Sequence, residues 1–434
     1  MNSIPQNDPS EKKSGQLRPV EQSQRFLSLD VIRGIAVLGI LMMNILSFGL
    51  PGCKYSNPMS MGEISGTTWC VWFLGHIFFD IKFWSLFSLL FGAGISVMRD
   101  RTMAKGKSPL KLHYSRMFWL ALIGLMHGHL LWFGDILFIY AITGMLLYFC
   151  LRFRPTWRIF IGLVLLMIGV GINLLLGMSL PQWDETSRNE MMENWQPSSE
   201  VVQGELDVYR GSYFEHLPSR SQTALAFELF LFPLVFFWRT GGLLLIGSAL
   251  YQYGVITGDR SAKFYRWGAA LCLIPGFLAC LVGVYLNHYY RWEFEYSFFQ
   301  GSTPNYVGGV GVSLGYICLI NLWIKSQYYS GFKKRLAAVG QMALTNYLSQ
   351  SVICTLIFYG HGLGWFGYLT RLELVGVVLA IWCFQLAISP IWLQHFRFGP
   401  VEWIWRSLTY LKRQPMVRKQ PTLGFEKGSA NNSN

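Results

Sequence analysis

Two ionisable side chains lie eight residues apart in a segment that is otherwise largely apolar. His127 and Asp135 belong to the stretch RMFWLALIGLMHGHLLWFGDILFIYAITG, where Gly134 predicts a chain break that lets the aspartate fold back toward the imidazole. A histidine held by a carboxylate is suited to general base catalysis, because the carboxylate stabilises its charged form. The alternative is a structural pair, in which a carbonyl of another helix satisfies His127 and Asp135 is a helix N-terminal charge. His129 lies about 200° around the helix from His127 and is a weaker candidate.

A second set of polar residues lies in the first apolar stretch, DVIRGIAVLGILMMN. In a helix, Asp30 and Arg33 lie one turn apart on one side, whereas Asn44 lies about 21 Å further along the axis. The guanidinium is suited to holding phosphate, and the amide of Asn44 could stabilise a developing oxyanion. One helix is therefore expected to carry polar groups at two depths.

Three further ionisable residues lie inside apolar stretches. Asp80 and Lys82 are two residues apart and project to nearly opposite sides of a helix, so each needs its own partner. Lys82 could neutralise a ligand phosphate or pair with Asp30. Arg239, which precedes Thr-Gly-Gly, suits phosphate or carboxylate recognition. The alternative for Arg239 is a structural bond to carbonyl oxygens.

A polar stripe runs along a late apolar stretch, GQMALTNYLSQS. Its members recur at helical spacing, so they share one face that either joins helices together or lines a wet cavity. Both outcomes remain open from the sequence. The stripe consists of Gln341, Thr345, Asn346, Ser349 and Gln350.

These residues must be positioned by membrane-spanning helices. Of the 434 residues, 52% are hydrophobic and only 14% charged, and many windows of about 20 residues lack the charges of a soluble surface. The predicted fold is all-α, a polytopic membrane protein with about ten transmembrane helices. The windows are 30–50, 69–97, 114–132, 135–151, 157–179, 224–254, 265–288, 305–324, 336–359 and 374–395. The sixth contains Pro233, which predicts either a kinked helix or a surface segment joined to a span.

Lys and Arg indicate the orientation of the chain. Most of the 36 basic residues fall in every second loop and in the two tails, which predicts that both termini are cytoplasmic. The formal charge of +13 then reflects topology and attraction to anionic headgroups rather than nucleic-acid binding. The expected partner is therefore the lipid bilayer, and no nucleic acid.

The predicted organisation has four parts. Residues 1–28 form a polar cytoplasmic tail, and 29–396 a transmembrane domain with an acidic extracytoplasmic loop over 181–221, which is either a small folded cap or a mobile loop. Residues 397–412 form an interfacial helix that starts at Pro400, and 413–434 a disordered basic tail. Glu402 either stabilises that helix through its dipole or closes the inner mouth near Arg33. Seven of the eight cysteines lie in apolar spans, so we expect neither a disulfide framework nor a metal site.

Several of these segments resemble one family. RFLSLDVIRGIAVLGILMMNILSFGLP, KFWSLFSLLFGAGISV, GLMHGHLLWFGDILFIYAITG, GQMALTNYLSQSVICTLIFY and FGPVEWIWRSLTYLKR look like signature segments of the YeiB family of bacterial inner-membrane proteins, which is largely of unknown function. The first helix also resembles that of transmembrane acyltransferases such as the lysosomal heparan glucosaminide N-acetyltransferase. In those enzymes an Asp, an Arg three on and an Asn fourteen on open the catalytic domain, and here these are Asp30, Arg33 and Asn44.

This resemblance implies transfer of an acyl group from cytoplasmic acyl-CoA to an extracytoplasmic acceptor, with no tightly bound cofactor. The expected catalytic residues are His127, Asp135 and Asn44. The heparan enzyme has its active histidine after the first span, but residues 51–68 contain none, and His76 is the nearest. The expected substrate-binding residues are Asp30, Arg33, Lys82, Arg239, Asn346 and Gln350.

Two other function classes remain open. The same buried polar groups would form the substrate path of a transporter or flippase, although the halves of the sequence show no convincing repeat. A non-catalytic membrane protein would instead use the acidic loop as a docking surface.

Overall fold

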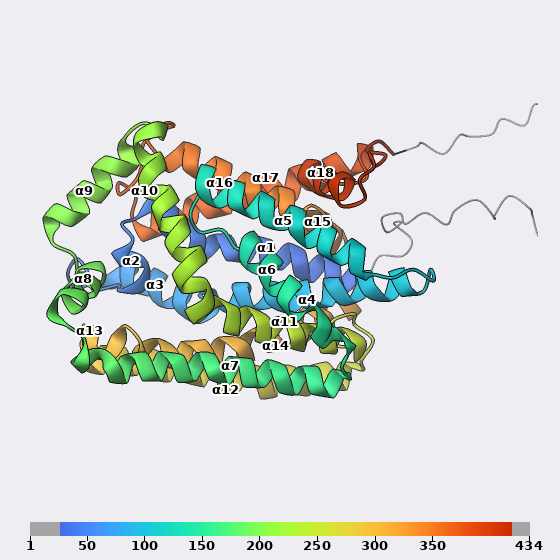
Figure 1. The fold of residues 1–434 in the computed structure, drawn as a ribbon, viewed down its shortest axis with the longest axis horizontal. Helices are drawn as coiled ribbons and strands as arrows, with labels where there is room; N and C mark the ends of the chain where they lie inside the picture. The colour runs from blue at the N-terminus through green and yellow to red at the C-terminus, as the bar shows by residue number, and fades with distance from the viewer. Residues whose placement is uncertain (1–26, 419–434) are drawn as a thin grey trace, which may run out of the picture.

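The protein is a bundle of long helices that run roughly along one axis (Figure 1). The computed structural model describes residues 27–418. Both ends of the described chain lie at one end of the bundle, together with the loop that joins α4 to α5 and with α18. We call this the basic end. Helices α8, α9 and α13 lie at the opposite end, which we call the cap end.

Within residues 27–418, seven helical segments are long and apolar enough to cross a membrane, by length and composition. The prediction of an all-helical, polytopic membrane-type protein is therefore confirmed. The long helices are α1 (Leu27–Gly49), α4 (Lys82–Met103), α5 (Leu110–Leu130), α7 (Pro155–Ser179), α11 (Phe237–Gln252), α12 (Ala262–Tyr289), α14 (Thr303–Lys325), α16 (Ala343–Phe358) and α17 (Arg371–His395). The shorter ones are α2 (Cys53–Ser56), α3 (Gly66–Phe78), α6 (Leu137–Leu147), α8 (Glu185–Trp195), α9 (Ser199–Arg210), α10 (Tyr213–Ala226), α13 (Phe294–Ser297), α15 (Ser330–Gln341) and α18 (Pro400–Thr409).

The second predicted span, 69–97, is not one helix. Helix α3 ends at Phe78 and α4 begins at Lys82, and between them Ile81 has a left-handed backbone with φ of 52°. A β-branched residue in this region is strained, so the surrounding contacts must hold the break in place. Hydropathy did not reveal the break, because the helices on both sides of it are predominantly apolar. Asp80 and Lys82 therefore flank an interruption instead of lying in mid-helix.

The sixth window is a kinked continuous helix rather than a surface segment. Helix α10 leads directly into a π-helix, η5 (Phe227–Phe236), and then into α11. Pro233 lies inside the π-helical stretch and removes one backbone donor from it. The widened turn accommodates this loss without ending the helix.

The acidic segment 181–221 is a folded cap. Two of its helices begin with Asp184 and Ser198, whose side chains accept a hydrogen bond from the first turn. The indole of Trp195 donates to the carbonyl of Trp292, and Arg210 donates twice to the carbonyl of Phe366. These bonds fasten the cap to two other connections at the same end of the bundle.

Glycine pairs set the closest helix crossings. A Cβ added to Gly92 on α4 would lie 1.9 Å from the Leu244 carbonyl oxygen of α11, and one on Gly247 would lie 2.0 Å from the Leu89 oxygen. Real Cβ atoms cannot approach a carbonyl so closely, so only glycine permits these two backbones to touch. The result is a tight pair, α4 and α11, that carries Lys82 and Arg239 of the polar network described below.

The C-terminal segment contains a helix where an interfacial helix was predicted, α18 (Pro400–Thr409). Helix α18 begins at Pro400, as expected for proline at a first helical position. The chain beyond α18 returns to α17, since the N–H of Arg418 donates to the His395 carbonyl. The rest of the predicted C-terminal tail and the N-terminal tail up to residue 26 lie outside the described residues.

Candidate functional site

A buried hydrogen-bonded relay joins α5, the connection that follows it and α16. His127 Nδ1 lies 2.8 Å from Asp135 Oδ1, and His127 Nε2 lies 2.8 Å from Ser351 Oγ. The side chains of the histidine and the aspartate are only 1% and 4% exposed. The predicted return of Asp135 to the imidazole is therefore confirmed.

Local backbone geometry orients the relay. Asp135 Oδ2 accepts a 2.7 Å hydrogen bond from the Phe138 N–H, in the first turn of α6. Helix α5 ends just after the histidine, where the N–H groups of Leu131 and Trp132 both donate to the His127 carbonyl. The aspartate thus does two jobs, because one oxygen stabilises a helix N-terminus and the other holds the imidazole.

This order of groups fits a proton relay. Both oxygens of Asp135 are at hydrogen-bond donors, so His127 Nδ1 carries the proton and donates to Oδ1. Nε2 is then left as the acceptor for the Ser351 hydroxyl. A serine bonded to a histidine that a carboxylate orients is the arrangement of an activated nucleophile, recognised by geometry rather than by sequence order.

Ser351 escaped the sequence analysis. It directly follows Gln350 at the end of the polar stripe, and 224 residues separate it from His127. The only signal in the sequence was its spacing of one helical turn from Tyr347. In the structure the Tyr347 ring centroid lies 5.2 Å from that of His127. Both side chains are on the α16 face that packs against the imidazole.

Aromatic rings pack beside the relay on the side of the cap end. The Trp132 ring lies 6.3 Å from the imidazole of His127 and stacks on Phe48 of α1 at 4.2 Å. Asn44 lies one turn before Phe48 and is half-buried. Within the described residues its side chain makes no hydrogen bond, so no bond joins Asn44 to His127.

His129 belongs to a separate polar group. Its Nδ1 lies 2.6 Å from Ser221 Oγ, and its Nε2 lies 3.4 Å from Glu228 Oε2. Glu228 lies in the π-helix and was not anticipated from the sequence. Because His129 points away from His127, as the helical geometry predicted, the two imidazoles serve different neighbourhoods.

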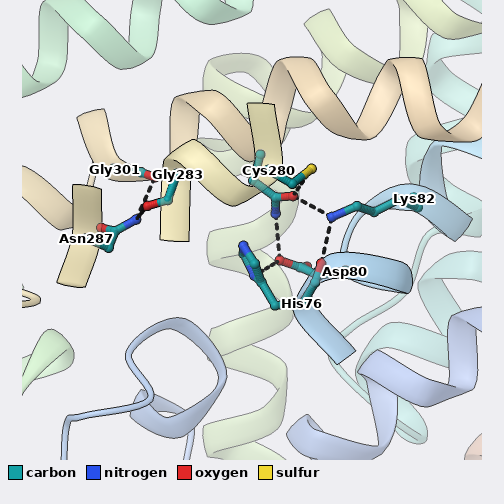
Figure 2. A network of polar contacts seen from close by, with 8 residues as sticks. His76, Asp80, Lys82, Cys280, Gly283, Asn287 and Gly301 are labelled. Carbon is teal, nitrogen blue, oxygen red and sulfur yellow. Dashed lines mark hydrogen bonds and ion pairs between the residues drawn. The ribbon is translucent and has the colours of Figure 1, made fainter. Parts of the chain in front are cut away.

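A third polar network fills the break between α3 and α4 (Figure 2). His76 Nδ1 lies 3.0 Å from Asp80 Oδ2, and the same oxygen accepts a 2.8 Å bond from Asn305 Nδ2. Lys82 Nζ donates to Asn305 Oδ1 at 2.5 Å and to the His76 carbonyl at 2.6 Å. The amide of Asn305 therefore bridges the carboxylate and the ammonium. The predicted pairing of Lys82 with Asp30 is wrong, because the helix break turns Lys82 toward α14.

Arg239 lies beside this network, fully buried. Its Nη1 donates to the Tyr306 carbonyl and its Nη2 to Ser85 Oγ, both at 2.7 Å. The guanidinium also lies 4.5 Å from the centroid of the Tyr306 ring. The alternative of a structural bond to a carbonyl oxygen therefore describes one of its two hydrogen bonds.

The remaining predicted residues fall into two places. Arg33 Nη1 donates to Asp30 Oδ1 at 3.2 Å, near the basic end. Asn346 Nδ2 donates to the Val339 carbonyl and to Ser389, whereas Gln350 Nε2 donates to the Val37 carbonyl and to Gln385. These two amides of the stripe join helices together rather than line a wet cavity.

A small pocket opens at the basic end between α4, α5 and α18. Two arginines contribute to it, and the guanidinium of Arg116 lies 4.3 Å from the centroid of the Trp405 ring. The pocket is lined by Met98, Leu112, Arg116, Trp405, Arg406, Thr409 and Tyr410.

Comparisons with known proteins identify relatives over nearly the full chain. Residues 250–412 match the family described as "Protein of unknown function (DUF418)". The chain is 33% identical over 401 residues to "Uncharacterized protein YeiB" of Escherichia coli (strain K12), covering 91% of this chain and 99% of that protein. It is 30% identical over 419 residues to "Uncharacterized protein YxaH" of Bacillus subtilis (strain 168), covering 93% and 98% respectively.

Proposed function

This chain belongs to the YeiB family, and we propose that it is a membrane-embedded acyltransferase that moves an acyl group from cytoplasmic acyl-CoA to an extracytoplasmic acceptor. The observation that carries the proposal is the buried Ser351–His127–Asp135 relay, with 2.8 Å between successive partners. A histidine between a carboxylate and a hydroxyl in a dry site can both take and return a proton.

The chemistry proceeds in two half-reactions. His127 Nε2 takes the hydroxyl proton while Ser351 Oγ attacks the thioester carbonyl, and the C–S bond breaks. The proton passes from His127 to the departing thiolate, which leaves as the free thiol of CoA. An acceptor hydroxyl or amine then attacks the Ser351 ester, gives its proton to His127, and the proton returns to Ser351 Oγ.

Asn44 and the basic end complete the proposal. Asn44, half-buried one turn before Phe48, donates to the oxyanion of either half-reaction. Arg33 and Arg116 provide positive charge for the phosphates of CoA near the pocket at the basic end. Asp30 holds Arg33 in place through their 3.2 Å bond.

The proposed topology has ten spans in the bacterial inner membrane, with both termini in the cytoplasm. Three elements are added to the seven long apolar segments: α5, α6 with the following 3₁₀ turn, and α15 with α16. The grouping of basic loops with both ends of the described chain supports this orientation (Figure 1).

Transport is the second candidate, and one observation favours it. Spanning helices of transporters are often interrupted at the substrate site, and the break between α3 and α4 lies beside buried Lys82 (Figure 2). Buried Arg239 bonds Ser85 in the first turn of α4. In that case Asp80, Asn305 and the two cations would bind the substrate. An acyltransferase needs Ser351, whereas a carrier of this design needs Lys82.

The deciding experiment uses purified protein in sealed vesicles with acetyl-CoA labelled in the acetyl group. After brief exposure of the protein to labelled acetyl-CoA, we expect peptide mass spectrometry to find the label on Ser351. The label should be absent from the Ser351→Ala variant. Ser349→Ala is the matched control, since Ser349 on the same helix only bonds Asn346 and Gln385. Wild-type labelling that persists in Ser351→Ala would sink the acyl-serine mechanism.

A further inference from the structure

Five polar and aromatic side chains meet beneath the cap, and we call them the cap cluster: Tyr209, His216, Arg220, Tyr359 and His361. Three of them are buried to 1% exposure or less, namely His216, Arg220 and Tyr359. They come from α9, α10 and the connection that follows α16. None of them takes part in the relay or in the network at the helix break.

The cluster contains polar atoms that lack hydrogen-bond partners among the described residues. These are both ring nitrogens of His216, Nη2 of Arg220, the hydroxyl of Tyr359 and Nδ1 of His361. Buried polar atoms in native proteins are nearly always satisfied by protein, ordered water or ligand. Several unsatisfied atoms in one place therefore indicate that something polar belongs between them.

Ring distances place these groups next to one another. The imidazole of His216 lies 4.9 Å from the Tyr359 ring and 4.3 Å from the Tyr209 ring. His361 lies 5.9 Å from Tyr359. Burial and the nearby charge of Arg220 lower the pKa of His361, which favours the neutral imidazole. His361 is only half-buried, which gives the cluster an opening at the surface.

Arg220 is the charged member of the cluster. Its Nε donates to the His129 carbonyl at 3.0 Å and its Nη1 to the Leu131 carbonyl at 3.3 Å. The ring of Tyr213 lies 4.7 Å from the guanidinium. No carboxylate of the described chain forms an ion pair with it. A buried cation without a counterion is costly, and an anion that reaches Nη2 would remove that cost.

We infer that the cap cluster binds an oxyanion, the phosphate or carboxylate group of a molecule that enters from the cap end. Arg220 Nη2 supplies charge, and Tyr359, His216 and His361 supply neutral hydrogen bonds around it. The Tyr209 ring forms the apolar wall on the side of His216.

The cluster is coupled to the relay through the end of α5. The two carbonyls that Arg220 holds belong to His129 and Leu131, and the Leu131 N–H donates to the His127 carbonyl. An anion at Arg220 would therefore stabilise the turn that orients His127. If the proposed acyl transfer also holds, the bound oxyanion belongs to the acceptor, but binding itself does not depend on that function.

The test measures thermal unfolding of the full chain in phosphatidylcholine nanodiscs. Inorganic phosphate or acetate is added at constant ionic strength, and a parallel set of discs contains phosphatidylglycerol. Binding to the folded state raises the unfolding midpoint with ligand concentration. A rise with free phosphate or acetate supports a soluble oxyanion, and a rise only with phosphatidylglycerol supports a lipid headgroup. No rise in any arm overturns the inference.

Two conservative variants assign the effect to the cluster. Tyr359→Phe and His216→Phe keep the packing and should each raise the half-saturating anion concentration by about tenfold or more, because one bond to a charged group is lost. Tyr140→Phe is the control, since its buried hydroxyl already bonds Ser88 and the Trp84 carbonyl. The inference is overturned if both cluster variants respond to the anion as the wild type does and Tyr359→Phe has a higher unfolding midpoint. That result would mean that the Tyr359 hydroxyl is buried without any partner.

Discussion

The hydroxyl of Ser351 lies 2.8 Å from His127 Nε2, although 224 residues separate the two in the chain. The bond joins the middle of α16 to the end of α5, and the second ring nitrogen is held by Asp135. Because the side chains of Ser351 and His127 are almost fully buried, the hydrogen bond between them is shielded from water and gains electrostatic strength.

Asp135→Asn should lower acyl transfer by about 10²–10⁴-fold, because the amide no longer stabilises a charged imidazole and can favour the wrong tautomer. Initial rates with labelled acetyl-CoA in vesicles measure the effect. His113→Gln is the control. His113 lies in the other half of α5, and its buried imidazole bonds the Gly144 carbonyl of α6. Equal rates in wild type and Asp135→Asn would contradict the relay.

Asp80→Asn and Lys82→Met should affect stability non-additively, because Asn305 bonds both side chains. Asp80→Asn removes the negative charge near the buried cations Lys82 and Arg239. This should lower the free energy of unfolding by about 3–5 kcal/mol. A double-mutant cycle from unfolding in mixed detergents measures the coupling, which should be about 0.5–3 kcal/mol. Additive effects would show that the two residues act independently.

Gly92→Ala should destabilise the bundle by about 1–3 kcal/mol, since the new methyl would lie 1.9 Å from the Leu244 carbonyl oxygen and force α4 and α11 apart. Gly94→Ala, two residues further on the same helix, meets no atom within 4 Å and is the matched control. Thermal unfolding of both variants checks the prediction. Similar midpoints for the two would mean that the crossing is looser than described.

Glu402 should make stability depend on pH. Burial raises the pKa of its carboxyl above the ordinary value of 4.5, against the opposing effect of hydrogen bonds from Thr345 and Leu344. The folded state therefore binds the proton more tightly, so this contribution is complete below pH 4.5 and is lost as pH rises through the raised pKa. Relative to Glu402→Gln, the wild-type unfolding midpoint should fall as the pH rises above 4.5. Parallel pH profiles would contradict the assignment.

The sequence predicted the parts of the site that local spacing controls. His127 and Asp135 are eight residues apart with a glycine between them, so their pairing could be predicted from one segment. Ser351 could not, because its position depends on how α16 packs on α5. Hydropathy likewise located most helices but concealed the break at Ile81, which depends on contacts with α14.

The polar stripe shows the same limit. Its spacing predicted one shared face, but only the packing of α1 and α17 decides that Asn346 and Gln350 bond other helices. Glu402 differs in another way. Its place in the first turn of α18 agrees with the helix-dipole alternative, but the spacing gave no sign that its carboxylate also accepts the N–H groups of Leu344 and Thr345 at the start of α16.

That last contact has a consequence for biosynthesis. The donors of Leu344 and Thr345 leave the ribosome before their acceptor, because α18 follows α16 and α17 in the chain. During translation the first turn of α16 therefore lacks these two hydrogen bonds until α18 has been made. Nascent chains stalled before Glu402 should contain the helices α1 to α17 yet remain sensitive to protease at the start of α16.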